Sequence, residues 1–246
     1  MAKQLKGGYT TGACLAAGAK AGAMIMQGED PGDIVDIVAL DGTPLQIPIA
    51  SVELLAHGVK VEIIKDAGDD PDITNGTSVF ITFSFLTQEQ LQPVYGQSIL
   101  YKQILFEAGQ GIGHATKPGL SLAVGEPAIN PGPRQLVYNS IKDIIGDKAC
   151  LVRVDIPAGT ELATKTLNPV LGIEGGISVI GTTGVLRPMS EEAFKNSLVP
   201  QIEVAKAAGF TTQIFVPGKI GERIATSWGL PTEAMVQTST FIGFML

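Results

Sequence analysis

Side chains that commonly bind metals or carry redox chemistry are scarce in this 246-residue sequence. There are two cysteines, Cys14 and Cys150, and two histidines, His57 and His114. None of these residues has the close spacing of a zinc site or of a Cys-x-x-Cys redox motif, so no zinc-type cluster is predicted. We expect the cysteines to be reduced core thiols of a cytoplasmic protein.

Positive charge is also in short supply. The chain has 17 lysines and arginines against 24 aspartates and glutamates, a formal net charge of −7. A general nucleic-acid binder or a binder of anionic membranes needs a basic surface, so both classes are excluded. No apolar run approaches the length that spans a bilayer. Hydrophobic residues make up 45% of the chain and charged residues only 17%, which predicts a folded chain with ample core.

Apolar patterning in the first part of the chain predicts an α+β domain with a mostly antiparallel sheet, over residues 1–165. Asp41-Gly42 is typical of a hairpin turn between two short strands. Alanine-rich and amphipathic patterns predict two helices beside the strands. The predicted helices are 13–27 and 135–145, and the predicted strands are 34–40, 45–49, 59–64, 79–86 and 150–156.

The patterning changes in residues 166–246, which predict a smaller, Rossmann-like α/β domain with parallel strands. Strands at 177–180, 212–216 and 234–237 alternate with helices at 190–208 and 219–228, an order typical of right-handed crossovers. Ligands in such sheets bind at the carboxyl ends of the strands. The last seven residues carry no helix stop signal, so we expect this domain to be incomplete at its C-terminus.

Residues 166–190, the glycine-rich stretch, hold five glycines within thirteen positions. Glycine lets a ligand approach main-chain N–H groups, because no Cβ holds it off. The alternative is a pair of tight turns around a core strand. The position of the stretch favours the floor of a cleft between the two predicted domains.

Residues 65–72, the acidic turn, hold four aspartates beside Lys65. Crowding like charges raises pKa values unless a cation or hydrogen bonds compensate. A metal site, an acid/base site, a site for a cationic group and a solvated turn all remain open. Thr10 and Thr11, just before a helix, are typical of an ordinary cap or of an anion site.

Five strings in order carry a resemblance to a known family. They are GYTTGAC, KDAGDDPDITNG, TKPGL, GEPAINPGPR and LNPVLGIEGGISVIGTTGVLRPMS. Together they resemble the cobalt-precorrin-5B C1-methyltransferases of anaerobic cobalamin biosynthesis, the CbiD family, over nearly the whole chain. Two positions depart from the family pattern, because Asn75 stands where a histidine is expected and Gln110 where an acid is expected.

The resemblance implies an enzyme that transfers a methyl group from S-adenosylmethionine to C1 of cobalt-precorrin-5B, giving cobalt-precorrin-6A. Cobalt then enters only as part of the substrate, and no protein-bound metal is expected. It implies that the donor is held by Gly175, Gly176, Gly181, Thr182, Thr183 and Gly184. Substrate carboxylates would meet Thr10, Thr11, Lys117, Arg134 and Arg187, with Lys165 a further candidate. The catalytic candidates are Asp66, Asp69 and Asp70, which would orient pyrrolic N–H groups or stabilise the charge that the ring gains.

Two other functions remain open. One is a non-catalytic tetrapyrrole carrier that has lost turnover through C-terminal truncation, and the other is a generic binder of adenosylmethionine or a nucleotide. A homo-oligomer is compatible with the sequence.

Overall fold

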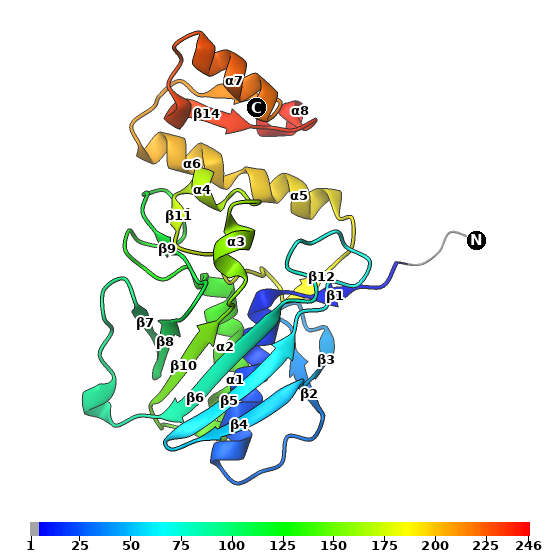
Figure 1. Ribbon diagram of the computed structural model, residues 1–246, viewed down its shortest axis with the longest axis vertical. Helices are drawn as coiled ribbons and strands as arrows, with labels where there is room; N and C mark the ends of the chain where they lie inside the picture. Colours follow the sequence, from blue (N-terminus) through cyan, green and yellow to red (C-terminus); the bar gives the residue numbers. More distant parts are fainter. Residues whose placement is uncertain (1–4) are drawn as a thin grey trace.

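A six-stranded mixed sheet is the largest element of the computed structural model, which describes residues 5–246. The strand order is β4–β5–β6–β10–β8–β7 (Figure 1). Neighbouring strands run antiparallel except β10 and β8, which are parallel. The strands are β4 (Ser51–Leu55), β5 (Gly58–Ile64), β6 (Ser78–Phe85), β10 (Cys150–Asp155), β8 (Ile104–Ala108) and β7 (Ser98–Tyr101).

Two long helices, α1 (Thr11–Met26) and α2 (Pro131–Ile145), pack against each other and cover one face of the sheet (Figure 1). Alternate residues of β6, among them Ile81 and Phe83, point toward the helices and are fully buried. Gly18 lies directly over Ile81, where a Cβ would collide with the isoleucine side chain. Small residues on α1 therefore let the helix approach the sheet closely, and this contact forms the main core.

Three short strand pairs join other parts of the chain. The first is the predicted hairpin around Asp41, and the other two connect segments that are distant in sequence. They bring the N-terminal segment and the glycine-rich stretch to one end of the large sheet. The pairs are β2 (Ile34–Val38) with β3 (Pro44–Pro48), β1 (Gly8–Tyr9) with β12 (Val185–Leu186), and β9 (His114–Ala115) with β11 (Ile173–Glu174).

The rest of the chain is mostly helical and includes a small parallel pair of strands, β13 and β14. In Figure 1 this pair and α7 lie at the opposite end of the molecule from β4. The elements are α3 (Gly159–Ala163), α4 (Asn168–Leu171), α5 (Glu191–Leu198), α6 (Pro200–Ala207), β13 (Ile214–Val216), α7 (Lys219–Ser227), β14 (Met235–Gln237) and α8 (Ile242–Met245), with 3₁₀ turns η1 (Gln88–Gln90) and η2 (Thr232–Ala234).

The predicted helix over 190–208 is two helices. Pro200 has no N–H to continue the first helix and instead occupies the first position of α6, where its fixed φ is favourable. The predicted strand 177–180 does not start a parallel sheet with β13. Within residues 5–246, Ile177 and Val179 form single bridges to Ile112 and Ile129, so this segment belongs with the loops at the end of the large sheet.

The predicted α+β class with a largely antiparallel sheet is confirmed at the level of a mixed α/β fold with one large sheet. The division at residue 165, and a Rossmann-like second domain, stay predictions, and residues 1–4 of the first predicted domain lie outside the described part. Strands β4, β7 and β8 were not predicted. None of the helices within residues 5–246 has both the length and the apolar character needed to cross a membrane.

Candidate functional site

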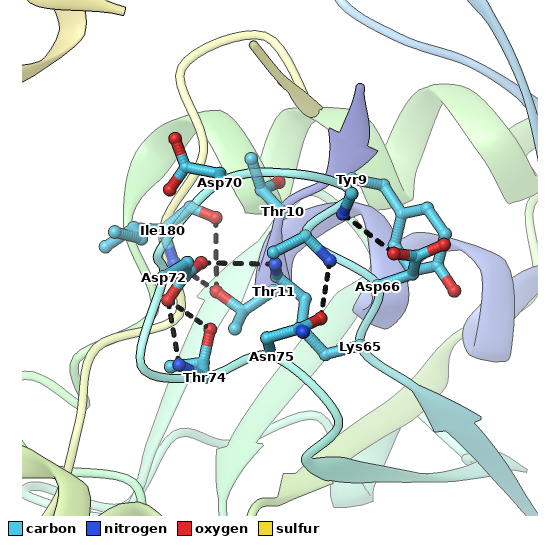
Figure 2. Close-up of polar contacts among 12 residues, drawn as sticks. Tyr9, Thr10, Thr11, Lys65, Asp66, Asp70, Asp72, Thr74, Asn75 and Ile180 are labelled. Carbon is cyan, nitrogen blue, oxygen red and sulfur yellow. Dashed lines mark hydrogen bonds and ion pairs between the residues drawn. The ribbon is translucent and has the colours of Figure 1, made fainter. Parts of the chain in front are cut away.

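Three segments that are far apart in the sequence meet at the N-terminus of α1 (Figure 2). The backbone N–H of Tyr9 donates to the carbonyl of Asp66 at 2.9 Å, and that of Thr10 donates to the carbonyl of Gly184 at 2.9 Å. Residues 6–10 thus lie between the acidic turn and the glycine-rich stretch. The structure therefore brings together three of the predicted sets: the threonines, the aspartates and the second half of the glycines.

The acidic turn is stabilised by a buried lysine, Lys65. The Lys65 side chain is 1% exposed, and its Nζ donates to Asp72 Oδ2 at 3.1 Å. The other oxygen of Asp72 accepts from the N–H and the hydroxyl of Thr74, at 2.8 Å and 2.7 Å. Asn75 Oδ1 accepts from the N–H of Ala67 at 2.9 Å, which closes the turn. Asn75, at the position where the resemblance led us to expect histidine, therefore has a structural role here.

The remaining aspartates of the turn each accept from a different donor group, two of which belong to Lys6. Asp66 Oδ2 accepts from Lys6 Nζ at 2.6 Å, and Asp69 Oδ2 accepts from the Lys6 N–H at 2.7 Å. Asp70 Oδ2 accepts from the N–H of Met189 at 2.9 Å. In Figure 2 the drawn carboxylates point in different directions. Among residues 5–246, no three side chains of histidine, cysteine, aspartate or glutamate are grouped to hold a metal ion.

For Asp66 and Asp72, hydrogen bonds and a nearby cation compensate for the crowding, so their pKa values are lowered rather than raised. The hydrogen bond from Lys6 holds the pKa of Asp66 below its usual value. Burial alone would raise the pKa of Asp72, but the bonds from Thr74 and the charge of Lys65 outweigh it, so this pKa is also lowered. The charges are stabilised because each carboxylate has its own donor.

Backbone N–H groups at the N-terminus of α1 are hydrogen-bonded by other residues of the chain. Thr10 caps the helix by accepting from the N–H of Ala13 at 3.2 Å, and the N–H of Gly12 donates to the carbonyl of Ile180 at 2.9 Å. The Thr11 hydroxyl lies 3.0 Å from the N–H of Ile180 and 3.2 Å from its carbonyl. The ordinary cap, one of the two alternatives left open, therefore describes this helix start.

Gly181 and Gly184 are explained by close packing within the chain. Gly181 has φ of 140°, and a Cβ there would collide with the Thr10 hydroxyl. Gly184 has φ of 103°, and a Cβ there would lie 2.9 Å from Leu136 Cδ2. Both positions need glycine whether or not a ligand binds beside them.

Gly175 and Gly176 contact a different part of the chain. A Cβ on Gly176 would overlap the carbonyl of Gly111, and the Gly175 carbonyl accepts from the Thr160 hydroxyl at 3.2 Å. The glycines predicted to hold one cofactor thus divide between two packing contacts, at residues 175–176 and 181–184.

Three residues of the site present apolar or hydroxyl groups to solvent. Ile180 is 52% exposed and Met189 is 68% exposed. Thr182 is also exposed, whereas Thr183 is half-buried and its carbonyl accepts from the N–H of Leu40 at 2.7 Å. Sequence reasoning missed Lys6, Ile180 and Met189, and the sequence gives no signal for them because their roles depend on contacts across the chain.

The predicted basic residues do not form one cluster. Arg134 is 7% exposed, and it donates to Glu126 Oε2 at 3.1 Å and to the carbonyl of Ile129 at 2.6 Å. Arg187 is 77% exposed and lies 3.6 Å from Asp41.

The two predicted lysines lie by the short helices. Lys117 donates to the carbonyl of Val170 in α4 at 3.3 Å, and Lys165 pairs with Glu161 in α3 at 2.8 Å. Arg187 lies within the glycine-rich stretch and is the more exposed of the two predicted basic residues there, at 77% against 56% for Lys165 just before it.

Two open hollows mark this end of the molecule. One, of about 500 Å³, is lined by residues 75–78 together with Phe80, Pro157 and Ala158, so it borders the segment that follows the acidic turn. The other, of about 470 Å³, lies around His114 and Tyr95. Neither lining, within residues 5–246, includes the glycines predicted to bind the cofactor.

Comparison with known proteins gives a consistent result. A family model described as CbiD matches residues 1–188. The chain is similar to proteins named cobalt-precorrin-5B C(1)-methyltransferase from Desulfitobacterium hafniense (42% identity), Moorella thermoacetica (43%) and Methanocaldococcus jannaschii (44%). These matches cover 98%, 100% and 99% of this chain but 59%, 64% and 65% of the relatives, so the chain spans about three fifths of their length.

A solved structure has a similar fold. It is the 1.9 Å crystal structure of a cobalamin biosynthesis protein (CbiD) from Archaeoglobus fulgidus, with a TM-score of 0.54 and 21% sequence identity. The match covers 94% of this chain and 70% of the other. At this identity the likeness supports the fold alone.

Proposed function

The chain belongs to the CbiD family, and on that basis we propose that it transfers a methyl group from S-adenosylmethionine to C1 of cobalt-precorrin-5B, giving cobalt-precorrin-6A. One observation carries the proposal: relatives named for this reaction match the chain over nearly all of its length. The N-terminal segment, the acidic turn and residues 180–184 all lie inside the family match. Cobalt is part of the substrate in this reaction.

The surface around the acidic turn is the proposed location of the reaction. Of the four carboxylates there, Asp66 and Asp72 pair with the ammonium groups of Lys6 and Lys65, and the other two leave an excess of two negative charges. The methyl donor carries a sulfonium cation, so its reactive centre fits this electrostatic environment. Ile180 and Met189 add exposed apolar surface against which a macrocycle can lie.

When bound, S-adenosylmethionine supplies an activated methyl group. The protein then has to align donor and acceptor and to exclude water, and neither task demands a special nucleophile. The Thr182 hydroxyl and the backbone of residues 182–184 are proposed to hold the donor. Asp66 and Asp69 are proposed to stabilise the positive charge that the ring gains on methylation.

The substrate carries acetate and propionate carboxylates, which require cationic partners. Arg187 is proposed as one partner because it is exposed and its contact with Asp41 is long. Thr10, Thr11 and Lys117 stay predicted contacts. Arg134 is proposed to act structurally, because its guanidinium is buried against Glu126.

The direct test is incubation of the protein with methyl-labelled S-adenosylmethionine and cobalt-precorrin-5B, followed by mass analysis of the corrinoid. Product methylated at C1 supports the proposal. Tight binding of the substrate without product would instead identify a carrier, and absence of both would refute the proposed function.

A variant pair tests the location. Arg187→Met is expected to weaken binding of cobalt-precorrin-5B about tenfold, since it removes a charge-assisted hydrogen bond. Lys142→Met is the matched control, because Lys142 is exposed near the far end of α2. If the two variants bind the substrate with equal affinity, Arg187 is not part of the substrate site.

A further inference from the structure

One hydrogen bond joins the acidic turn to the C-terminal part of the chain. Asp70 Oδ2 accepts from the N–H of Met189 at 2.9 Å, across 119 positions of sequence. Met189 precedes Ser190, the N-cap of α5, whose hydroxyl accepts from the N–H of Ala193 at 3.1 Å. Asp70 therefore holds the residue at which α5 begins.

The segment that Asp70 holds is short and adopts an unusual backbone conformation. Residues 187–189, here called the linker, run from β12 to α5. Met189 has φ of 55°, a left-handed conformation that is unfavourable for a residue with a Cβ and persists where neighbouring groups stabilise it. Asp70 accepts from the N–H of this same residue, so the carboxylate stabilises the left-handed conformation of Met189.

The linker also carries two highly exposed groups of the proposed site. Met189 is 68% exposed and the Arg187 side chain is 77% exposed. At the other end of the linker, β12 is fixed by its pairing with β1. The directions of the Arg187 and Met189 side chains therefore depend on how the end of the linker next to α5 is anchored.

We propose that Asp70 is a positioning residue for the substrate site: its carboxylate acts as the hydrogen-bond acceptor that fixes the linker and so orients Met189 and Arg187 toward the tetrapyrrole. This inference rests on the proposed function and replaces the catalytic role predicted for Asp70. The required property is an acceptor at the Met189 N–H, and the negative charge is secondary.

The acceptor and the charge can be separated by substitution. Asp70→Asn keeps an oxygen that can accept from the Met189 N–H and removes the charge, whereas Asp70→Ala removes both. A positioning role predicts that asparagine restores most of what alanine loses. A role that depends on charge predicts an equal loss in both variants.

The experiment combines hydrogen–deuterium exchange with measured affinity for cobalt-precorrin-5B. In Asp70→Ala we expect amide exchange at Met189 and in the first turn of α5 to become about tenfold faster, and affinity to fall about tenfold, because the hydrogen bond that fixes the linker is lost. Asp70→Asn should show exchange and affinity close to wild type. Asp30→Ala is the matched control, because exposed Asp30 likewise accepts one backbone N–H, from Gly32 at 2.9 Å.

Several outcomes would overturn the inference. They are equal losses in Asp70→Asn and Asp70→Ala, exchange in Asp70→Ala no faster than in Asp30→Ala, or a lower melting temperature with unchanged affinity. If wild type neither binds nor methylates the substrate, the proposed function fails. The exchange measurement then still decides whether Asp70 fixes the linker.

Discussion

The ion pair between Lys65 and Asp72 in the acidic turn provides the sharpest test of the structure. Asp72→Ala would leave the ammonium of Lys65, which is 1% exposed, without its carboxylate partner. Breaking a buried pair in this way costs about 3–5 kcal/mol, because the remaining charge is neither solvated nor paired. The Asp72 side chain is 25% exposed, so water can reach part of the site, and we expect a loss near the lower limit, about 3 kcal/mol.

The assay is urea unfolding at pH 7, with the free energy of unfolding extrapolated to zero denaturant. Asp69→Ala is the control, because exposed Asp69 accepts one hydrogen bond from Lys6, and it should cost less than about 1 kcal/mol. Lys65→Met in the Asp72→Ala background removes the stranded charge, so the double variant should be more stable than Asp72→Ala alone. A loss below about 1 kcal/mol in Asp72→Ala, or additive losses in the double variant, would refute the reasoning.

Three further predictions concern the pH dependence of stability, the reactivity of the thiols and the packing at Gly184. The pKa of Asp72 is lowered in the folded protein, so this carboxylate stabilises the fold at pH values above its unfolded pKa of about 4. That stabilisation is lost as pH falls, and a series of melting temperatures from pH 7 to pH 3 should therefore show a drop below about pH 4. Burial raises the pKa of the Cys14 and Cys150 thiols to about 12, so neither should react with a thiol reagent at pH 8 until the protein is unfolded by urea. Gly184→Ala places a Cβ against Leu136 at φ of 103°, and calorimetry should show a destabilisation of about 2 kcal/mol or more, whereas a neutral result would contradict the packing contact.

Local patterns predicted the elements whose stability is local. The helix near Ala13, the Asp41-Gly42 hairpin and the alternating strand that ends at Phe85 all appear in the structure. Each depends on a period or a turn type that neighbouring residues determine. The strand β8 was missed because its apolar residues run directly into Gly109, which favoured a loop in that region.

Contacts between distant residues could not be predicted in the same way. Ile177–Ile180 has the composition of a buried strand, and that composition does not reveal which partner it bonds to. The structure pairs it singly with Ile112 and Ile129 rather than with β13. The contact of Arg134 with Glu126, eight positions away, was also missed, because no period or turn type indicates which carboxylate a buried arginine binds.

The junction at the N-terminus of α1 indicates how the family strings should be interpreted. Four residues of these strings are held within the chain by hydrogen bonds or close packing: Gly181, Gly184, Asp72 and Thr11. Substituting any of them should therefore change folding before it changes chemistry. Informative substitutions for catalysis lie among the exposed neighbours of these residues, whose removal leaves the junction intact. The family strings thus supply two kinds of residue: those that hold the junction together, and the exposed side chains of the proposed substrate surface beside them, such as Thr182 and Arg187.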